Sequence, residues 1–180
     1  MKMWSEEKRA GTLEILFSSP KDRLNFVMGK FFACLCLVIL CLFMTIGIPI
    51  TVSTFGNLDL GPVIGAYIAC IFLASFYIAL GLYVSAKTDN QIVSLITSIL
   101  ILSIFYLLGS NFFTSLFSSS TADTLRLIGS GSRFEAITRG VLDIRDIYYY
   151  LSLTIIFLTL NLYTLESFSW DKKKSKPFKN

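Results

Sequence analysis

The chain has 180 residues, of which 54% are hydrophobic and only 16% are charged, and its mean hydropathy is +0.67. Soluble domains carry about 25% charged residues, so this composition excludes a disordered chain and disfavours an ordinary cytosolic enzyme. The length corresponds to a single domain. The net charge of +4 resides largely in a basic tail, because five of the sixteen Lys and Arg residues lie in residues 172–180. This clustering is not typical of a face that binds nucleic acid.

Several classes of chemistry lack the residues they need. There is no histidine, which removes His-based catalysis and His-ligated metal sites. The four cysteines, Cys34, Cys36, Cys41 and Cys70, lie in apolar runs without C-x-x-C spacing, so we interpret them as buried apolar residues. No P-loop motif and no protease constellation occurs. We therefore predict no catalytic, metal or cofactor-binding site, and no cofactor.

Residues 1–30 form a charged N-terminal segment with six Lys or Arg and four acidic residues. Its longest apolar run, Leu13 to Phe17, is interrupted by Glu14 and is too short for a cleavable signal peptide. Thr12 can cap a short amphipathic helix over residues 13–18, and Pro20 suits the first turn of a second helix that enters the membrane. The residues alone predict a short helix along the inner membrane surface.

Four apolar stretches are long enough to cross a bilayer, which takes about 20 residues in a helix. They cover residues 31–52, 62–86, 92–109 and 147–165, and none contains a charged residue beyond its ends. Irregular backbone cannot face lipid, so each stretch is predicted to be a helix. The expected fold is an all-α membrane bundle with four transmembrane helices, a single domain embedded in the lipid bilayer.

The second stretch differs from the others because small residues repeat along it. Small side chains let helix backbones approach closely in a membrane, which indicates a helix at the centre of the bundle. The alternative is that small residues are simply scattered, as in many membrane helices. The predicted packing residues are Gly65, Ala66, Ala69, Cys70 and Ala74.

The distribution of Lys and Arg predicts the orientation. The N-terminal segment, the short loop at Lys87 and the tail together hold twelve of these residues, whereas residues 110–146 hold four. Positive charge is retained on the cytoplasmic side, so both termini are expected in the cytoplasm. Tyr148, Tyr149 and Tyr150 are expected to form part of an aromatic belt at the outer interface.

The outer segment, residues 110–146, is predicted to contain a short amphipathic helix. Ser132 and Glu135 have the spacing of a capping box at a helix start. From there, apolar residues repeat at intervals of three and four up to Ile144, which forms one face of a helix lying on the outer membrane surface. Such a helix either bridges two spans or lines an exit.

Two segments resemble a known family. Residues 6–16 (EEKRAGTLEIL), followed by Pro20, resemble the E-x-x-x-G-T-x-E-x-L…P signature of ABC-2 type transporter permeases. Residues 139–146 with residues 148–153 resemble the segment before the last span in the gliding-motility and copper-enzyme-maturation branch of that family. The resemblance covers nearly the whole chain.

The resemblance implies a permease subunit of an ATP-driven exporter in the bacterial inner membrane. Its N-terminal segment would dock as a coupling helix on a separate ATPase subunit, and two permease copies, identical or different, would enclose the path. The chain resembles the C-terminal part of a six-span permease without its first two transmembrane helices. The residues that match the coupling pattern are Glu7, Arg9, Gly11, Thr12, Leu13, Glu14, Leu16 and Pro20.

Two other functions remain open from the residues. One is a membrane scaffold or assembly protein of four helices that transports nothing. The other is a small secondary carrier, which the uncharged spans disfavour because such carriers place an ionisable residue near mid-membrane. Association with a P-loop ATPase would distinguish the permease from both alternatives, whereas flux that depends on a proton gradient would favour the carrier.

Overall fold

The computed structural model describes residues 4, 23–115, 119–141 and 143–175, and every element within them is a helix. Four spans are long and apolar enough to cross a membrane, with α3 and α4 together forming the first. The predicted all-α bundle with four spans is therefore confirmed. The helices are α3 (Arg23–Met44), α4 (Gly47–Phe55), α5 (Leu60–Lys87), α6 (Gln91–Gly109), α7 (Asn111–Thr114), α8 (Ser119–Ile128), α9 (Ser130–Thr138) and α10 (Ile144–Ser175).

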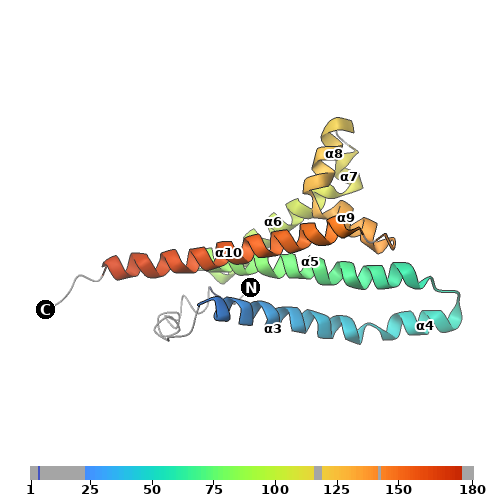
Figure 1. Cartoon of the computed structure of the whole chain (residues 1–180), viewed down its shortest axis with the longest axis horizontal. Coiled ribbons are helices and arrows are strands. Elements are labelled where there is room, and N and C mark those ends of the chain that lie inside the picture. The colour runs from blue at the N-terminus through green and yellow to red at the C-terminus, as the bar shows by residue number, and fades with distance from the viewer. Residues whose placement is uncertain (1–3, 5–22, 116–118, 142, 176–180) are drawn as a thin grey trace.

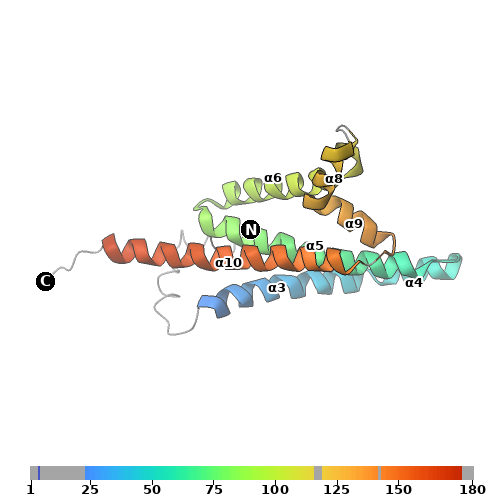
Figure 2. The same cartoon turned by 45° about the horizontal axis from the view of Figure 1, so that its top comes forward.

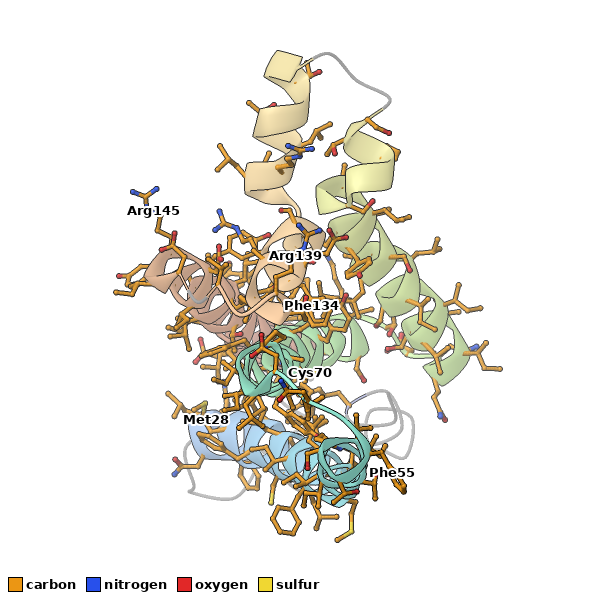
Figure 3. All side chains as sticks on the ribbon, turned by 90° about the vertical axis from the view of Figure 1, so that its right-hand side faces the viewer. Met28, Phe55, Cys70, Phe134, Arg139 and Arg145 are labelled. Carbon is orange, nitrogen blue, oxygen red and sulfur yellow. The ribbon has the colours of Figure 1, made fainter. Side chains whose placement is uncertain are left out.

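The helix α5 lies at the centre of an elongated bundle. It contacts α3, α6, α9 and α10, and Figure 1 shows α3, α5 and α10 running side by side along the long axis. We call the end toward which α10 extends the tail end, and the opposite end the cap end. Figure 3, viewed from the cap end, shows α3 and α4 on one side of α5 and the helices α7–α9 on the other.

The first span is broken between α3 and α4. Pro49 has no N–H, and its ring crowds the carbonyl four residues earlier, that of Thr45, so a continuous helix cannot form there. Around the break, the Thr45 N–H donates to the Leu42 carbonyl at 3.1 Å, and the Thr45 hydroxyl lies 3.0 Å from the Tyr67 hydroxyl on α5. The span predicted over residues 31–52 is therefore present, but it consists of two helices separated by a break at residues 45–46.

The starts of α5 and α6 are fixed by side-chain caps. The carboxylate of Asp59 accepts a hydrogen bond from the Gly61 N–H at 3.1 Å, and the side-chain oxygen of Asn90 accepts one from the Ile92 N–H at 3.0 Å. Such caps satisfy N–H groups that have no partner inside the helix. The short polar connection of residues 88–90 therefore sets α6 antiparallel to α5, from which it diverges toward the cap end (Figure 2).

Two apolar clusters hold the bundle together. The tail-end core joins the start of α3, the end of α5 and the later part of α10, and it includes Val27, Phe31, Leu82, Ala86, Leu158 and Leu165. The second cluster, the cap-end core, centres on Phe76, whose ring packs against Phe105 of α6 at 5.6 Å and Phe157 of α10 at 5.9 Å. Beside the cap-end core, the Ser75 and Thr154 hydroxyls lie 3.3 Å apart and link α5 to α10.

The helices α7, α8 and α9, which we call the cap, follow α6; α7 and α8 project away from the bundle, and α9 folds back onto α5 and α6 (Figure 1). A short outer helix was predicted, but its start and end differ. The helix α9 begins after Gly129, and the Ser132 hydroxyl donates to the Arg126 carbonyl at 2.9 Å, so Ser132 is not its N-cap. The helix ends at Thr138 because Gly140 adopts φ +86° and the Val141 N–H donates back to the Ala136 carbonyl.

Candidate functional site

Trp4 occupies the centre of the tail-end core. Its side chain is fully buried among residues of α3, α5 and α10. The Trp4 backbone N–H donates to the Ser85 hydroxyl on α5 at 3.1 Å, and the Lys30 ammonium of α3 lies 3.7 Å from the centre of the indole ring. A cation over an indole face is a favourable electrostatic contact. A residue of the N-terminal segment thus packs against three helices. This contact was not predicted from the sequence.

Asn161 of α10 is a second buried polar residue at this end of the bundle. Its side chain is fully buried, and neither its amide nitrogen nor its oxygen has a hydrogen-bond partner within the described chain. Leu158 and Leu165, one turn to either side on the same face, belong to the tail-end core. A lone Asn between leucines was a visible signal in the sequence, because polar residues inside a span are costly and seldom incidental.

We expect Asn161→Leu to stabilise the isolated protein by about 1 kcal/mol, since an unpaired buried polar group costs about 1–3 kcal/mol. The measurement is the midpoint of thermal unfolding in detergent, compared with wild type. Leu162→Ala, which removes apolar packing one residue away, is expected to shift the midpoint downward. A lower midpoint for Asn161→Leu would mean that the amide has a partner in the working protein.

The cap is held to α6 by close backbone approaches at three glycines. A Cβ atom at Gly129 would collide with the backbone of Gly109 on α6, and one at Gly131 would collide with the Tyr106 carbonyl oxygen. A Cβ at Gly109 would lie 2.8 Å from the Gly129 carbonyl carbon. Only residues without a side chain allow the start of α9 to lie this close to the end of α6.

A buried ion pair fastens the cap to α10. The Arg133 guanidinium donates from Nη1 to the Asp146 carboxylate at 2.6 Å and from Nη2 to the Leu127 carbonyl at 3.3 Å. The side chains of Arg133 and Asp146 are only 17% and 11% exposed. The guanidinium also lies 4.5 Å from the centre of the Tyr149 ring. The sequence placed Arg133 off the apolar stripe of the helix, which gave no indication that it is buried.

Two tyrosines of α10 reinforce this attachment. The Tyr150 hydroxyl donates to the Ser130 carbonyl at 2.8 Å, and the Tyr149 hydroxyl donates to the Ile128 carbonyl. Both acceptors lie at the junction of α8 and α9. Tyr150 is fully buried, whereas Tyr148 is 75% exposed. Of the three tyrosines expected in an interfacial belt, only Tyr148 has the exposure that such a role requires.

The predicted small residues of α5 lie in different surroundings. Gly65 is buried, and a Cβ atom there would collide with the Ile137 carbonyl oxygen of α9. Ala69 is fully buried in the cap-end core. Ala66, Cys70 and Ala74 are half-buried, so the structure brings only part of this ridge into close contact with neighbouring helices. Figure 3 places Cys70 near the centre of the bundle.

A lateral groove runs beside α5 between α3 and α6. One cavity of about 400 Å³ is bounded by all three helices, and a second of about 580 Å³ continues along α6 toward the cap end. Tyr77 and Leu102 border both. Among the residues that the structure describes, no charged side chain lines either cavity, so the groove offers an apolar surface for hydrocarbon or for side chains of another helix. The first cavity is lined by Cys34, Val38, Ala74, Tyr77, Ile78, Gly81, Leu82 and Leu102.

The eight residues predicted to contact an ATPase, from Glu7 to Pro20, lie outside the described residues. The structure therefore gives no geometry for this part of the predicted site. Within the described ranges there is no group of three or more Cys, Asp or Glu residues arranged to hold a metal ion.

A family model described as "ABC-2 family transporter protein" matches residues 1–169. No curated protein and no solved structure is detectably similar to the chain. Members of the matched family are transmembrane transport components that are not themselves catalytic, and they normally work with an ATPase subunit. The match extends over the N-terminal segment and all four spans. The chain belongs to the ABC-2 transporter family and is a multi-pass permease of an ABC-type transporter.

Proposed function

We propose that the chain is the membrane-spanning subunit of an ATP-driven exporter, and that residues 6–20 dock on a separate ATPase subunit. The observation that carries this proposal is the family match, which includes the N-terminal segment together with the spans. The sequence contains no P-loop, and the apolar stretches 31–52, 62–86, 92–109 and 147–165 carry no charge that could couple transport to an ion gradient. The energy for transport is therefore expected from a partner that hydrolyses ATP.

The chemistry of the N-terminal segment suits docking into a cleft. The spacing of Leu13 and Leu16 puts both on one edge of a helix, where they can fill an apolar groove. Around them, Glu7, Arg9 and Glu14 carry charge of both signs, which can fix the register of docking. Gly11, Thr12 and Pro20 provide the break and the helix start that would set this short element apart from α3.

The proposed arrangement puts both termini on the ATPase side of a bacterial inner membrane. The excess of Lys and Arg in the N-terminal segment, at Lys87 and in the tail supports this orientation. Two permease copies would then enclose the path, with the cap at its exit. The cap would be on the side opposite the ATPase, since α10 joins the cap to the basic tail.

The docking segment can be tested by placing a charge on its apolar edge. We expect Leu13→Asp and Leu16→Asp each to weaken association with the ABC ATPase that co-purifies with the tagged wild-type chain. The loss should be about 2 kcal/mol or more, roughly 30-fold in affinity, as for other buried anchor residues. Val141→Asp is the matched control, because Val141 is 63% exposed and follows the cap helix α9.

Undiminished association of both Asp variants would contradict the docking assignment. The alternative function, a scaffold that transports nothing, predicts a different result for the wild-type chain itself. A wild-type chain that retains no ABC ATPase after mild detergent extraction, and that moves nothing in response to ATP, would favour the scaffold.

A further inference from the structure

The N-terminal segment is attached to the bundle on both sides of the residues proposed to meet the ATPase. The segment proposed to meet the ATPase begins two residues after Trp4 and ends just before α3, which starts at Arg23. One attachment is covalent, because the chain continues from Pro20 into α3. The other is Trp4, which is fully buried in the tail-end core at the opposite end of the segment.

Three separate contacts fix the position of Trp4. Its ring packs in a cluster that includes Val27 of α3 and Leu82 of α5, its backbone N–H donates to Ser85, and Lys30 covers its ring. Apolar packing alone would allow the Trp4 ring to shift within the cluster. The hydrogen bond from the Trp4 backbone N–H additionally fixes the position of the main chain at this residue. The cluster also contains Leu158 and Leu165, so the same residue reaches α10.

We propose that Trp4 is a second mechanical attachment of the N-terminal segment, through which displacement of that segment moves α5 and α10 as well as α3. The role of the ATPase in this inference rests on the function proposed above. The cap contacts α5, α6 and α10, and α3 itself packs against α5 and α10, so Trp4 adds a direct contact from the N-terminal segment to this path. Through Trp4, a push at the tail end reaches α10, a single continuous helix whose other end carries Asp146, Tyr149 and Tyr150.

Trp4 is therefore a positioning residue, and its role predicts a separation of two measurements. It lies outside residues 6–20, so its substitution should leave association with the ATPase intact. It should nevertheless reduce the response of the cap end to ATP. A residue that only stabilises the bundle would instead lower the amount of folded protein and leave the response of each folded complex unchanged.

The attachment can be tested first without any partner. The chain has two tryptophans, Trp4 and Trp170, so the full-length Trp170→Phe variant in lipid nanodiscs reports on Trp4 alone. We expect blue-shifted emission and little quenching by acrylamide, as for a fully buried ring. Red-shifted emission with strong quenching would overturn the proposal, whatever the chain does with an ATPase.

Transmission is tested in the complex with the co-purifying ABC ATPase. The four native cysteines are replaced by alanine, and Ile144→Cys, at an 80% exposed position where α10 begins, is labelled with bimane. In the otherwise wild-type chain, trapping with ATP and vanadate is expected to change the bimane emission. Trp4→Ala should remove most of this change per complex, because the contact of the N-terminal segment with α5 and α10 is lost.

Variants of graded severity separate transmission from folding. Trp4→Phe should keep most of the response, and Lys30→Gln should reduce it measurably but less than Trp4→Ala, because it removes only the cation–π contact. Tyr148→Ala, an exposed aromatic on α10, is the control and should respond like wild type. A full response in both Trp4→Ala and Lys30→Gln would overturn the proposal. If Trp4→Ala does not fold, a full response in Lys30→Gln alone would overturn it. A wild-type chain that binds no ATPase would contradict the proposed function, while the fluorescence of Trp4 would still decide the attachment.

Discussion

Replacement of Asp146 by alanine is expected to destabilise the protein by roughly 3–5 kcal/mol, because it leaves the Arg133 guanidinium buried without its counter-charge. The pair is short, at 2.6 Å, and mostly shielded from solvent. The Leu127 carbonyl would remain as an acceptor for Arg133, but a neutral oxygen cannot balance a buried positive charge. The measurement is the free energy of unfolding in detergent, followed by circular dichroism.

Two controls identify the unpaired charge as the cause. The double variant Arg133→Met with Asp146→Leu should recover much of the stability, because replacing a buried ion pair by apolar residues is often nearly neutral. Arg139→Ala removes the more exposed pair between Arg139 and Glu135, whose side chains are 3.9 Å apart and 74% and 34% exposed. That change should cost less than about 1 kcal/mol. Equal losses for Asp146→Ala and Arg139→Ala would contradict the burial of the Arg133 pair.

Gly129→Ala is expected to destabilise the protein by about 3 kcal/mol, at the upper end of the usual cost of overpacking. The added methyl group would collide with the backbone of Gly109, which cannot move aside as a flexible side chain can. The start of α9 must then separate from the end of α6. The measurement is the same unfolding experiment, together with proteolysis of the cap in the native protein, which should become faster.

Gly29→Ala provides the matched control for this substitution. Gly29 lies in α3, and a Cβ atom there would meet nothing within 4 Å. Alanine is the better helix former by about 1 kcal/mol, so this variant should be slightly more stable than wild type. A neutral Gly129→Ala would mean that the cap does not lie against α6 as closely as the structure has it.

These two predictions bear on the same attachment of the cap to the bundle. The Arg133 pair and the two tyrosine hydrogen bonds join the cap to α10, and the three glycines join it to α6. A cap held from two helices responds to the angle between them. The cap therefore bridges α6 and α10, and a change in the angle between these two helices would strain this junction.

The long elements could be predicted from local pattern, since each uncharged apolar run has to be helical in lipid. The starts of α5 and α6 also had local signals in Asp59 and Asn90. The break before Pro49 and the end of α9 before Gly140 also have local causes, namely the ring of Pro49 and the positive φ of Gly140. They were not predicted from the sequence, because the apolar repeats continue past both residues. The assignment of the docking residues, by contrast, rests on a family resemblance, and the described residues provide no contact that supports it.

The buried polar residues could not be predicted in this way. Arg133 and Asp146 are 13 residues apart and Trp4 and Ser85 are 81 residues apart, so no helical period connects them. Their pairing depends on which helix faces lie together, and on close backbone approaches at Gly65, Gly109, Gly129 and Gly131.

The amino-acid sequence by itself determined that this protein lies in a lipid bilayer, that it has four spans and to which family it belongs. The reason is that hydrophobicity over about 20 residues and a short signature can both be read from residues that are neighbours along the chain. Only the tertiary structure decided that Trp4 is anchored among three helices and that the cap is fastened to α10 by a buried charge pair. Such contacts join residues that are distant along the chain, and their free energies arise from burial that exists only after the helices have packed.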